Sequence, residues 1–211
     1  MRILTIGTGK VGAALATRLR DLGHDLTLHN RTGTPPPGFA AADLTDDLPA
    51  AVAQAELILL AVPFAVAEEL LQAGAEWNGK IVVDATNPIA PGLRHLTIGN
   101  TGSGAERLQE LAPGASVVKA FNTTGYENLA DADYGEQRLA MCYAGDDAPA
   151  KQTVTGLIDA LGYEPCDTGG LFAARFLEPM ALAWIHPARL GGEGSDFGFA
   201  IARRPAKTSQ S

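Results

Sequence analysis

The residues best placed to do chemistry are three glycines near the start of the chain, spaced as Gly7-x-Gly9-x-x-Gly12. A short apolar run precedes them and a helix-forming run follows, and in that setting this spacing is typical of a dinucleotide site. Gly7 permits a tight turn, Gly9 lets the backbone approach a pyrophosphate, and Gly12 allows the helix to pack closely on the strand. The free N–H groups at the start of that helix, near Lys10, attract phosphate. The sequence therefore predicts a nucleotide site; an ordinary glycine turn is the alternative.

The turn after the second expected strand indicates which dinucleotide binds. Chains that prefer NAD usually place an acidic residue there to hold the ribose 2′-hydroxyl. Here the turn reads Asn30-Arg31-Thr32, with no acid. Arg31 can form a charge-assisted pair with a 2′-phosphate and stack on the adenine, while Asn30 and Thr32 add uncharged donors. The turn predicts NADP(H); a solvated surface arginine is the alternative.

Ligands of doubly wound sheets lie over the carboxyl ends of the strands, so three further turns are candidates. Ala61-Val62-Pro63 offers an apolar rim, or simply a helix start. Asn87 follows the fourth strand, and Phe121-Asn122 follows the fifth. Asparagine has donors and acceptors that suit a nicotinamide carboxamide, although it is also a common turn residue. The predicted cofactor-binding residues are Gly7, Thr8, Gly9, Lys10, Val11, Gly12, Asn30, Arg31, Thr32, Ala61, Val62, Pro63, Asn87, Phe121 and Asn122.

The segment 171–190 has helical periodicity and carries the remaining candidate residues. Its stripe Phe172, Phe176, Met180 and Ala183 is interpreted as core. Arg175 and Glu178 are interpreted as a structural i,i+3 pair, and Pro179 and Pro187 as residues that kink or end the helix. No catalytic dyad is visible. The candidates for an acceptor cleft are Asn122, Trp184 and His186; Phe121 and Trp184 offer flat apolar surface, although a lone histidine is more often structural.

Strand-like and helix-like segments alternate along the whole chain, which predicts an α/β fold: a doubly wound, mainly parallel Rossmann sheet with a small C-terminal α/β extension. The domains expected are an NADP-binding Rossmann domain (1–120), a small C-terminal subdomain (121–204) and a disordered tail (205–211). The expected strands are 2–6, 25–29, 56–62, 80–84, 115–120, 139–144, 163–166 and 197–202. The expected helices are 10–22, 48–54, 63–73, 125–129, one capped by Ser103 with Glu106 in a capping box, and one capped by 145–147 that runs to Leu161.

The net charge and composition of the 211-residue chain argue against several functions. A net charge of −8 disfavours nucleic acid and acidic membrane surfaces. A strand beginning at Arg2 leaves no room for a signal peptide, and no apolar run has the length of a membrane span. Cys142 and Cys166 fall in expected strands and are interpreted as a reduced, buried pair, which predicts a cytoplasmic protein. The four histidines form no i,i+4 pair and no Cys-x-x-Cys occurs, so no metal site is expected.

Several motifs occur in the order of one family, which this chain resembles from Arg2 to about Arg204: the NADPH-dependent deazaflavin reductases, also called coenzyme F420-dependent NADP oxidoreductases. The resemblance implies a homodimer, a small C-terminal subdomain that roofs the nicotinamide, and hydride exchange between NADPH and a flavin-like ring. The segments that carry it are 7–12, 30–31, Asp84-Ala85-Thr86-Asn87-Pro88, 103–106, 117–123, 145–147 and 175–179.

The predicted function is therefore an NADP-dependent oxidoreductase that transfers hydride between NADPH and a small flavin-like acceptor, with deazaflavin as co-substrate. Such a reaction needs few protein acids or bases, because the cofactor carries the chemistry and the protein aligns two rings. A homodimer is also expected from the aromatic residues Phe172, Trp184 and Phe197. Three alternatives stay open: an NADPH-dependent flavin or ferric reductase, a hydroxyacid dehydrogenase of the 6-phosphogluconate type, and a non-catalytic NADPH-sensing or interaction module. The dehydrogenase is disfavoured because too few residues follow Phe121 for its all-helical second domain.

Overall fold

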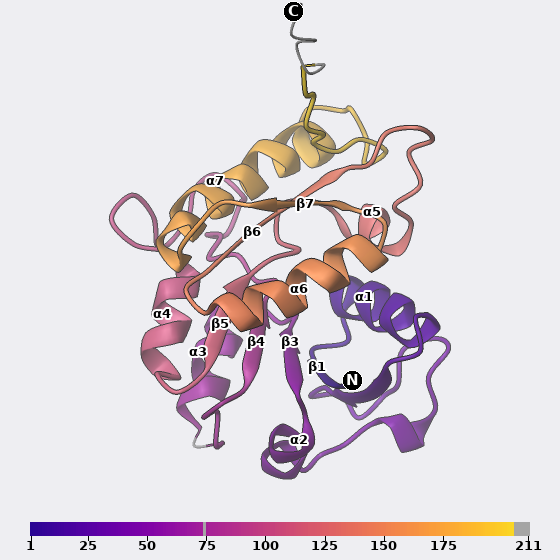
Figure 1. Cartoon of the computed structure of the whole chain (residues 1–211), viewed down its shortest axis with the longest axis vertical. Helices are drawn as coiled ribbons and strands as arrows, with labels where there is room; N and C mark the ends of the chain where they lie inside the picture. The colour runs from indigo at the N-terminus through magenta and orange to yellow at the C-terminus, as the bar shows by residue number, and fades with distance from the viewer. Residues whose placement is uncertain (74, 205–211) are drawn as a thin grey trace, which may run out of the picture.

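A computed structural model describes residues 1–73 and 75–204 of the chain, and within them seven strands form one sheet of order β2-β1-β3-β4-β5-β6-β7 (Figure 1). The first five strands run parallel, β6 pairs antiparallel with β5, and β7 pairs parallel with β6. This confirms the predicted fold class. The strands are β1 Arg2–Ile6, β2 Asp25–His29, β3 Leu57–Leu60, β4 Ile81–Asp84, β5 Ser116–Lys119, β6 Ala140–Gly145 and β7 Glu164–Asp167.

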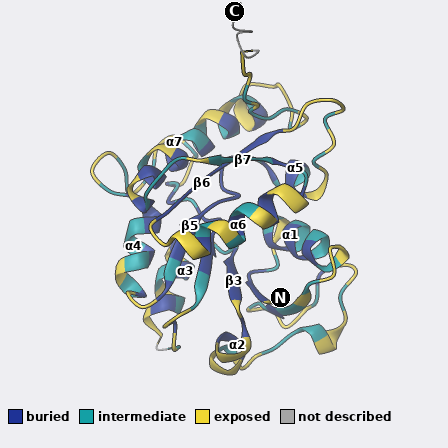
Figure 2. Cartoon of the chain, in the orientation of Figure 1, coloured by how far each residue is buried: buried dark blue, intermediate teal, exposed yellow. Residues whose placement is uncertain are grey.

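Helices cover both faces of the sheet and bury its strands (Figure 2). One apolar core joins α1, α5 and α6 to the sheet, and a second joins α2, α3 and α4 to the opposite face. The start of α7 reaches the second core and packs on β6 through a smaller cluster. The helices are α1 Lys10–Asp21, α2 Leu48–Gln54, α3 Phe64–Gln72, α4 Gly104–Leu111, α5 Tyr126–Ala130, α6 Ala148–Ala160 and α7 Ala174–Ile185.

Local sequence signals explain where several helices begin. The Asp47 carboxylate accepts from the Ala50 N–H at 3.0 Å at the start of α2, and Asp147 does the same for Ala150 at 2.7 Å in α6. Ser103 caps α4 by accepting from the Glu106 N–H at 3.1 Å. The Glu106 carboxylate in turn accepts from the Ser103 hydroxyl at 2.8 Å, so the two residues of the predicted capping box bind each other.

One predicted strand in the C-terminal part is wrong. Residues 197–202 form no strand: the Phe199 carbonyl accepts one hydrogen bond from the Ala140 N–H at 2.7 Å, but no ladder follows. Phe197 instead packs against α7. Pro179 does not end the helix, since α7 continues through it to Ile185, and a kink there stays a prediction; the α-helix ends just before Pro187, the other proline expected to kink or end it.

The predicted domain boundary and tail stay untested, and the prediction of reduced cysteines is partly supported. The boundary at residue 120 stays a prediction; β5 and β6 are joined there by only two paired positions, Val118 with Gly145 and Lys119 with Ala144. The expected tail, 205–211, lies outside the described residues. Both cysteines are free thiols, and burial raises the pKa of Cys142 to about 12. Among the described residues, no helix has the length and apolarity needed to cross a bilayer.

Candidate functional site

A cavity of about 780 Å³ opens at the carboxyl ends of β1, β2 and β3. The glycine loop forms one side of it, the turn after β2 another, and α3 a third. This volume falls in the range of small-molecule sites. The residues that line it are Ile6, Gly7, Thr8, Gly9, His29, Asn30, Arg31, Thr32, Val62, Pro63, Val66, Glu69, Leu70 and Ala73.

The three glycines of the motif have different surroundings. Gly7 has a φ of +98°, and a Cβ there would lie 2.4 Å from the Ala61 carbonyl oxygen. A Cβ on Gly12 would lie 1.9 Å from the Gly7 carbonyl oxygen, so α1 can start where it does only with glycine at this position. A Cβ on Gly9 would meet no atom within 4 Å. Gly7 and Gly12 are therefore required by the fold, whereas Gly9 borders the open space of the cavity.

The turn after β2 is organised by the Asn30 side chain. Its Nδ2 donates to Thr8 Oγ1 at 2.6 Å and to the Thr34 carbonyl at 2.8 Å. Its Oδ1 accepts from Thr32 Oγ1 at 3.1 Å and from the Gly33 N–H at 2.8 Å. All four hydrogen bonds of this amide are thus made within the chain, so Asn30 ties the turn to the glycine loop and does not present a free donor.

Arg31 lines the cavity next to this turn and is exposed. In the described part of the chain no hydrogen bond or ion pair to its guanidinium is found. A guanidinium beside a cavity, on a protein of net charge −8, is suited to pair with an anionic group of a ligand.

One wall of the cavity was not predicted. Val66, Leu70 and Ala73 line it from α3, together with Glu69. These residues repeat every three or four positions after Pro63, so helical periodicity could have identified this face. The sequence could not show that the face meets the glycine loop.

Asn87 and Asn122 follow neighbouring strands, β4 and β5, and hydrogen-bond to each other. Asn87 Nδ2 donates to the Asn122 carbonyl at 2.9 Å, and Asn122 Nδ2 donates to Asn87 Oδ1 at 3.0 Å and to the Leu177 carbonyl at 3.1 Å. Asn122 is 4% exposed, and within the described residues its Oδ1 atom has no partner. Since a buried unpaired acceptor is costly, this oxygen is a candidate acceptor for a ligand's donor, although neither asparagine is among the residues that line the cavity. Phe121, just before it, has a φ of +60°, a strained conformation of the kind found at functional sites.

Behind these turns lies a buried ion cluster that sequence reasoning missed. The Lys119 ammonium lies 2.8 Å from Asp84 Oδ2, 2.9 Å from Glu178 Oε1 and 2.6 Å from the Thr86 carbonyl oxygen. All three charged residues are fully buried. Burial by itself would lower the pKa of Lys119, but Asp84 and Glu178 outweigh it and raise this pKa above its usual value, so the lysine stays charged.

The predicted Arg175–Glu178 pair is wrong, because each residue finds a partner on another element. Arg175 forms a two-point ion pair with Glu106 of α4, with Nε and Nη2 at 2.8 and 2.7 Å from its carboxylate oxygens. Glu178 turns inward to Lys119 and also accepts from the Gly104 N–H at 2.9 Å. Partners on other elements are preferred to the i,i+3 neighbour on α7, because a two-point contact holds the carboxylate better than a single contact on a helix surface.

The remaining candidates lie apart from the cavity. Trp184 is 2% exposed, stacks on Phe197 with ring centroids 5.5 Å apart, and donates from Nε1 to the Phe197 carbonyl at 2.9 Å. It is therefore part of the packed interior and offers no open surface in this structure. His186 is exposed, and its Nε2 lies 2.6 Å from the Leu93 carbonyl oxygen. Lys10, at the start of α1, contacts the Tyr126 hydroxyl at 3.3 Å.

The stripe predicted as core is mostly on the surface. Phe172 and Phe176 are 55% and 66% exposed and meet edge to face, with centroids 6.3 Å apart. The core side of α7 is formed instead by Leu177, Ala181 and Trp184. The exposed aromatic pair is unusual for a solvated surface.

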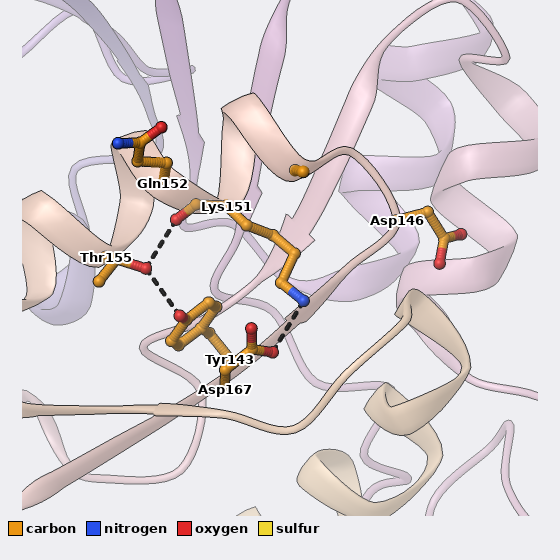
Figure 3. Close-up of a pocket in the computed structure, with 7 residues that line it drawn as sticks. Tyr143, Asp146, Lys151, Gln152, Thr155 and Asp167 are labelled. Carbon is orange, nitrogen blue, oxygen red and sulfur yellow. Dashed lines mark hydrogen bonds and ion pairs between the residues drawn. The ribbon is translucent and has the colours of Figure 1, made fainter.

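A second hollow, of about 360 Å³, lies between α6 and the ends of β6 and β7 (Figure 3). Its polar groups bind one another: Lys151 Nζ lies 2.8 Å from Asp167 Oδ1, and the Thr155 hydroxyl lies 2.7 Å from the Tyr143 hydroxyl. Asp146 points away from this group and accepts from the Leu171 N–H at 2.8 Å. Because these groups are already paired, the first cavity is the better candidate. Within the described part of the chain, no group of three or more histidine, cysteine or acidic side chains could hold a metal ion.

The lowered pKa values of two carboxylates indicate how the stability of the fold depends on pH. The Arg175 guanidinium lowers the pKa of Glu106. For Asp167, burial works to raise the pKa, but Lys151 and the Gly169 N–H outweigh it and lower this pKa below its ordinary value. Because both pKa values are lower in the folded state, the stabilisation is present above the unfolded pKa values, near pH 4, and is lost as pH falls through the folded ones.

We therefore expect thermal stability to fall as pH drops below about 4.5, and to fall less steeply in Glu106→Gln. The difference between the two proteins should be about 1 kcal/mol, since the Glu106–Arg175 pair is partly solvated. Thermal unfolding followed by circular dichroism from pH 3 to pH 7 measures it. Identical curves for parent and variant would show that the pair does not perturb Glu106.

Comparison with known proteins supports an oxidoreductase. Residues 2–88 match the family model described as NADP oxidoreductase, coenzyme F420-dependent. The crystal structure of a candidate F420-dependent NADP reductase from Arthrobacter sp. FB24 is 32% identical, with a TM-score of 0.83 over 95% of this chain and 99% of that one. A hypothetical protein from Sinorhizobium meliloti is 31% identical, with a TM-score of 0.70 over 82% of this chain and 88% of that one.

Two further similarities cover less of the other protein. The chain is 32% identical to metalloreductase STEAP3 from Rattus norvegicus in an alignment of 195 residues that covers 88% of this chain but only 38% of the length of that relative. A reductive aminase from Aspergillus terreus, in complex with NADPH and ethyl levulinate, is 22% identical with a TM-score of 0.64 over 90% of this chain and 62% of that one. The aminase shares the fold alone.

Proposed function

Since this chain belongs to the family of coenzyme F420-dependent NADP oxidoreductases, we propose that it transfers a hydride between NADPH and a flavin-like acceptor, with deazaflavin as the first acceptor. The observation that carries the proposal is the cavity at the glycine loop, where Gly9 faces open space and Arg31 stands unpaired among the described residues. NADPH, when bound, supplies the hydride from its nicotinamide ring.

The residues present fit this cofactor. The space beside Gly9 and the N–H groups at the start of α1 suit a pyrophosphate. Arg31 suits a 2′-phosphate, and the apolar face of Val66 and Leu70 suits an adenine ring. The unpaired Asn122 Oδ1 suits the amide donors of a carboxamide. The protein's own contribution is to bind and orient, since no acid–base pair is needed for hydride transfer between two rings.

We expect the protein to bind NADPH about 10- to 100-fold more tightly than NADH, because a charged hydrogen bond from Arg31 contributes roughly 1.5–3 kcal/mol. Arg31→Ala should remove most of this preference and lower NADH affinity much less, because NADH lacks the 2′-phosphate and loses only the stacking of Arg31 on the adenine. Fluorescence titration of both cofactors measures it. Arg94→Ala, in the exposed loop after β4 and absent from the cavity lining, is the matched control. Equal affinities of the parent protein for both cofactors would contradict the assignment to Arg31.

A second candidate activity is reduction of flavin or of a ferric complex. The identity with a rat metalloreductase favours it, although this chain spans only part of that relative. Anaerobic mixing of protein and NADPH with deazaflavin, riboflavin phosphate and a ferric chelate, each in turn, tests both activities through loss of nicotinamide absorbance. Fastest oxidation by deazaflavin supports the first proposal. Tight NADPH binding without oxidation by any acceptor would favour a sensing module instead.

For partners, the proposal includes a small-molecule acceptor and a second copy of this chain. The exposed residues Phe172, Phe176 and Leu190 supply apolar surface for that contact, whereas Trp184 is buried and Phe197 is stacked upon it. The two free cysteines favour a reducing compartment such as the cytoplasm.

Light scattering at micromolar concentration is expected to give the mass of a dimer. The double variant Phe172→Glu with Phe176→Glu should give a monomer, because four carboxylates would face one another across the contact. Gln152→Glu, at an exposed position of α6, serves as the control for added charge. A parent protein of monomer mass would rule out the proposed dimer.

A further inference from the structure

The buried cluster around Lys119 is built into the two turns that the proposed function assigns to the nicotinamide. Lys119 ends β5, and Asp84 ends β4 directly beside it in the sheet register. The three hydrogens of the ammonium have three acceptors, in Asp84, Glu178 and the Thr86 carbonyl. Every donor of the lysine is therefore used, and its position is determined from three sides.

Both backbone polar groups of Thr86, its N–H and its carbonyl, are bound by this cluster. Its N–H donates to Asp84 Oδ1 at 2.8 Å, and its carbonyl accepts from Lys119 Nζ at 2.6 Å. Thr86 is 3% exposed, and Asn87 is the next residue. The backbone from which the Asn87 side chain projects is thus fixed by one carboxylate and one ammonium.

The second turn is connected to the same cluster through α7. Leu177 accepts from Asn122 Nδ2 at 3.1 Å, and the adjacent Glu178 binds Lys119 at 2.9 Å. Glu178 also accepts from the first N–H groups of α4, those of Gly104 and Ala105. Leu177 and Glu178, which are consecutive in α7, therefore fix Asn122 and Lys119 relative to each other. Glu178 is itself bound to the amino end of α4.

A purely structural role would be served more simply by apolar residues. Burying charges is costly, and a buried ion cluster is often no more stable than well-packed apolar side chains of the same volume. What the ions supply that apolar packing does not is a directional hold on the two peptide groups that flank Thr86. The second of these groups leads to Asn87, whose amide binds the Asn122 turn.

We propose that Lys119 is a positioning residue: through the Thr86 carbonyl and Glu178 it fixes the Asn87 and Asn122 turns, and so decides which face of the nicotinamide meets the acceptor. This inference rests on the proposed function. It assigns no proton transfer to Lys119, because all three of its hydrogens are held by acceptors of the chain. The lysine acts only through the turns.

The test is the double variant Lys119→Met with Glu178→Gln. It removes one positive and one negative charge together, so the net charge of the cluster stays that of the Asp84 carboxylate, as in the parent. NADPH is labelled with deuterium at one or the other C4 position. We expect NADPH affinity within about threefold of the parent, transfer to deazaflavin slowed about 10- to 100-fold by misalignment, and label delivered from both faces instead of one. Val52→Ala, a core variant in α2, controls for lost stability and should keep transfer from a single face.

A folded double variant with parental rate and one-sided transfer would overturn the inference. If the double variant does not fold, Glu178→Gln alone is the deciding protein, because it keeps Lys119 and the side-chain volume; one-sided transfer at the parental rate there also overturns it. If the parent binds NADPH but reduces no acceptor, the proposed function fails. The fluorescence anisotropy of the bound nicotinamide then tests whether Lys119 positions the ring. Lower anisotropy in the variant than in the parent supports the positioning role, and equal values overturn it.

Discussion

We expect Gly9→Val to abolish NADPH binding while the protein stays folded. A Cβ at Gly9 meets no protein atom within 4 Å, so the fold has room for a side chain. The room lies in the cavity beside the start of α1, where a pyrophosphate would need to approach the backbone. Affinity should fall by at least about 100-fold, since both the space and the close N–H contacts are lost. Fluorescence titration gives the affinity, and thermal unfolding gives the stability.

Gly12→Val is the matched comparison, because the same substitution there should act on the fold. Its Cβ would lie 1.9 Å from the Gly7 carbonyl oxygen, and backbone atoms cannot move aside without shifting α1. We expect a loss of about 1–3 kcal/mol of stability or more. Retained NADPH binding in a folded Gly9→Val protein would mean that the glycine loop is only a turn.

The second large effect is expected for Asn122→Ala. This change removes hydrogen bonds to Asn87 and Leu177 and removes the unpaired Oδ1. Hydride transfer should slow by about 10- to 100-fold, because misplacement of the nicotinamide costs rate. NADPH affinity should change much less, since most of the cofactor contacts are proposed to lie in the cavity at β1 to β3. Single-turnover stopped flow with saturating NADPH separates the two effects.

Asn128→Ala is the control for that variant. Asn128, in α5, is also buried; its Nδ2 donates to Thr124 and to the Phe197 carbonyl, and its Oδ1 accepts from the Tyr134 hydroxyl, all at 2.7 Å, so at least as many hydrogen bonds are lost as at Asn122. It should lower stability without slowing transfer. Equal slowing in both variants would show that the effect at Asn122 is a general loss of packing.

The sequence predicted the parts of the molecule that depend on local signals. The glycine motif predicted the cavity, and periodicity with capping residues predicted seven strands and seven helices to within a few residues. Asn30 and Arg31 were placed at the end of β2 because a turn must follow that strand. These predictions succeed because backbone conformation and hydrophobic spacing are encoded within a few neighbouring residues.

The errors and omissions have a common physical cause, which is contact between distant segments. Periodicity shows that α7 has apolar stripes but not which stripe faces the sheet, so Phe172 and Phe176 were assigned to the core. The i,i+3 rule paired Arg175 with Glu178, whereas the folded chain offers each a stronger partner. Lys119 could not be connected with Asp84 and Glu178, since the three meet only when β4, β5 and α7 are assembled.

The most direct test of the central claim, hydride transfer from NADPH to a flavin-like ring, is to follow the hydrogen itself. NADPH carrying deuterium at the transferring position is mixed anaerobically with the protein and deazaflavin, and the reduced acceptor is examined by mass spectrometry. We expect that the deuterium appears in the reduced deazaflavin, that its transfer is slower than that of hydrogen, and that NADH supports the reaction far less well. Deuterium that stays in the nucleotide, or that is lost to water without reduction of the acceptor, would contradict it.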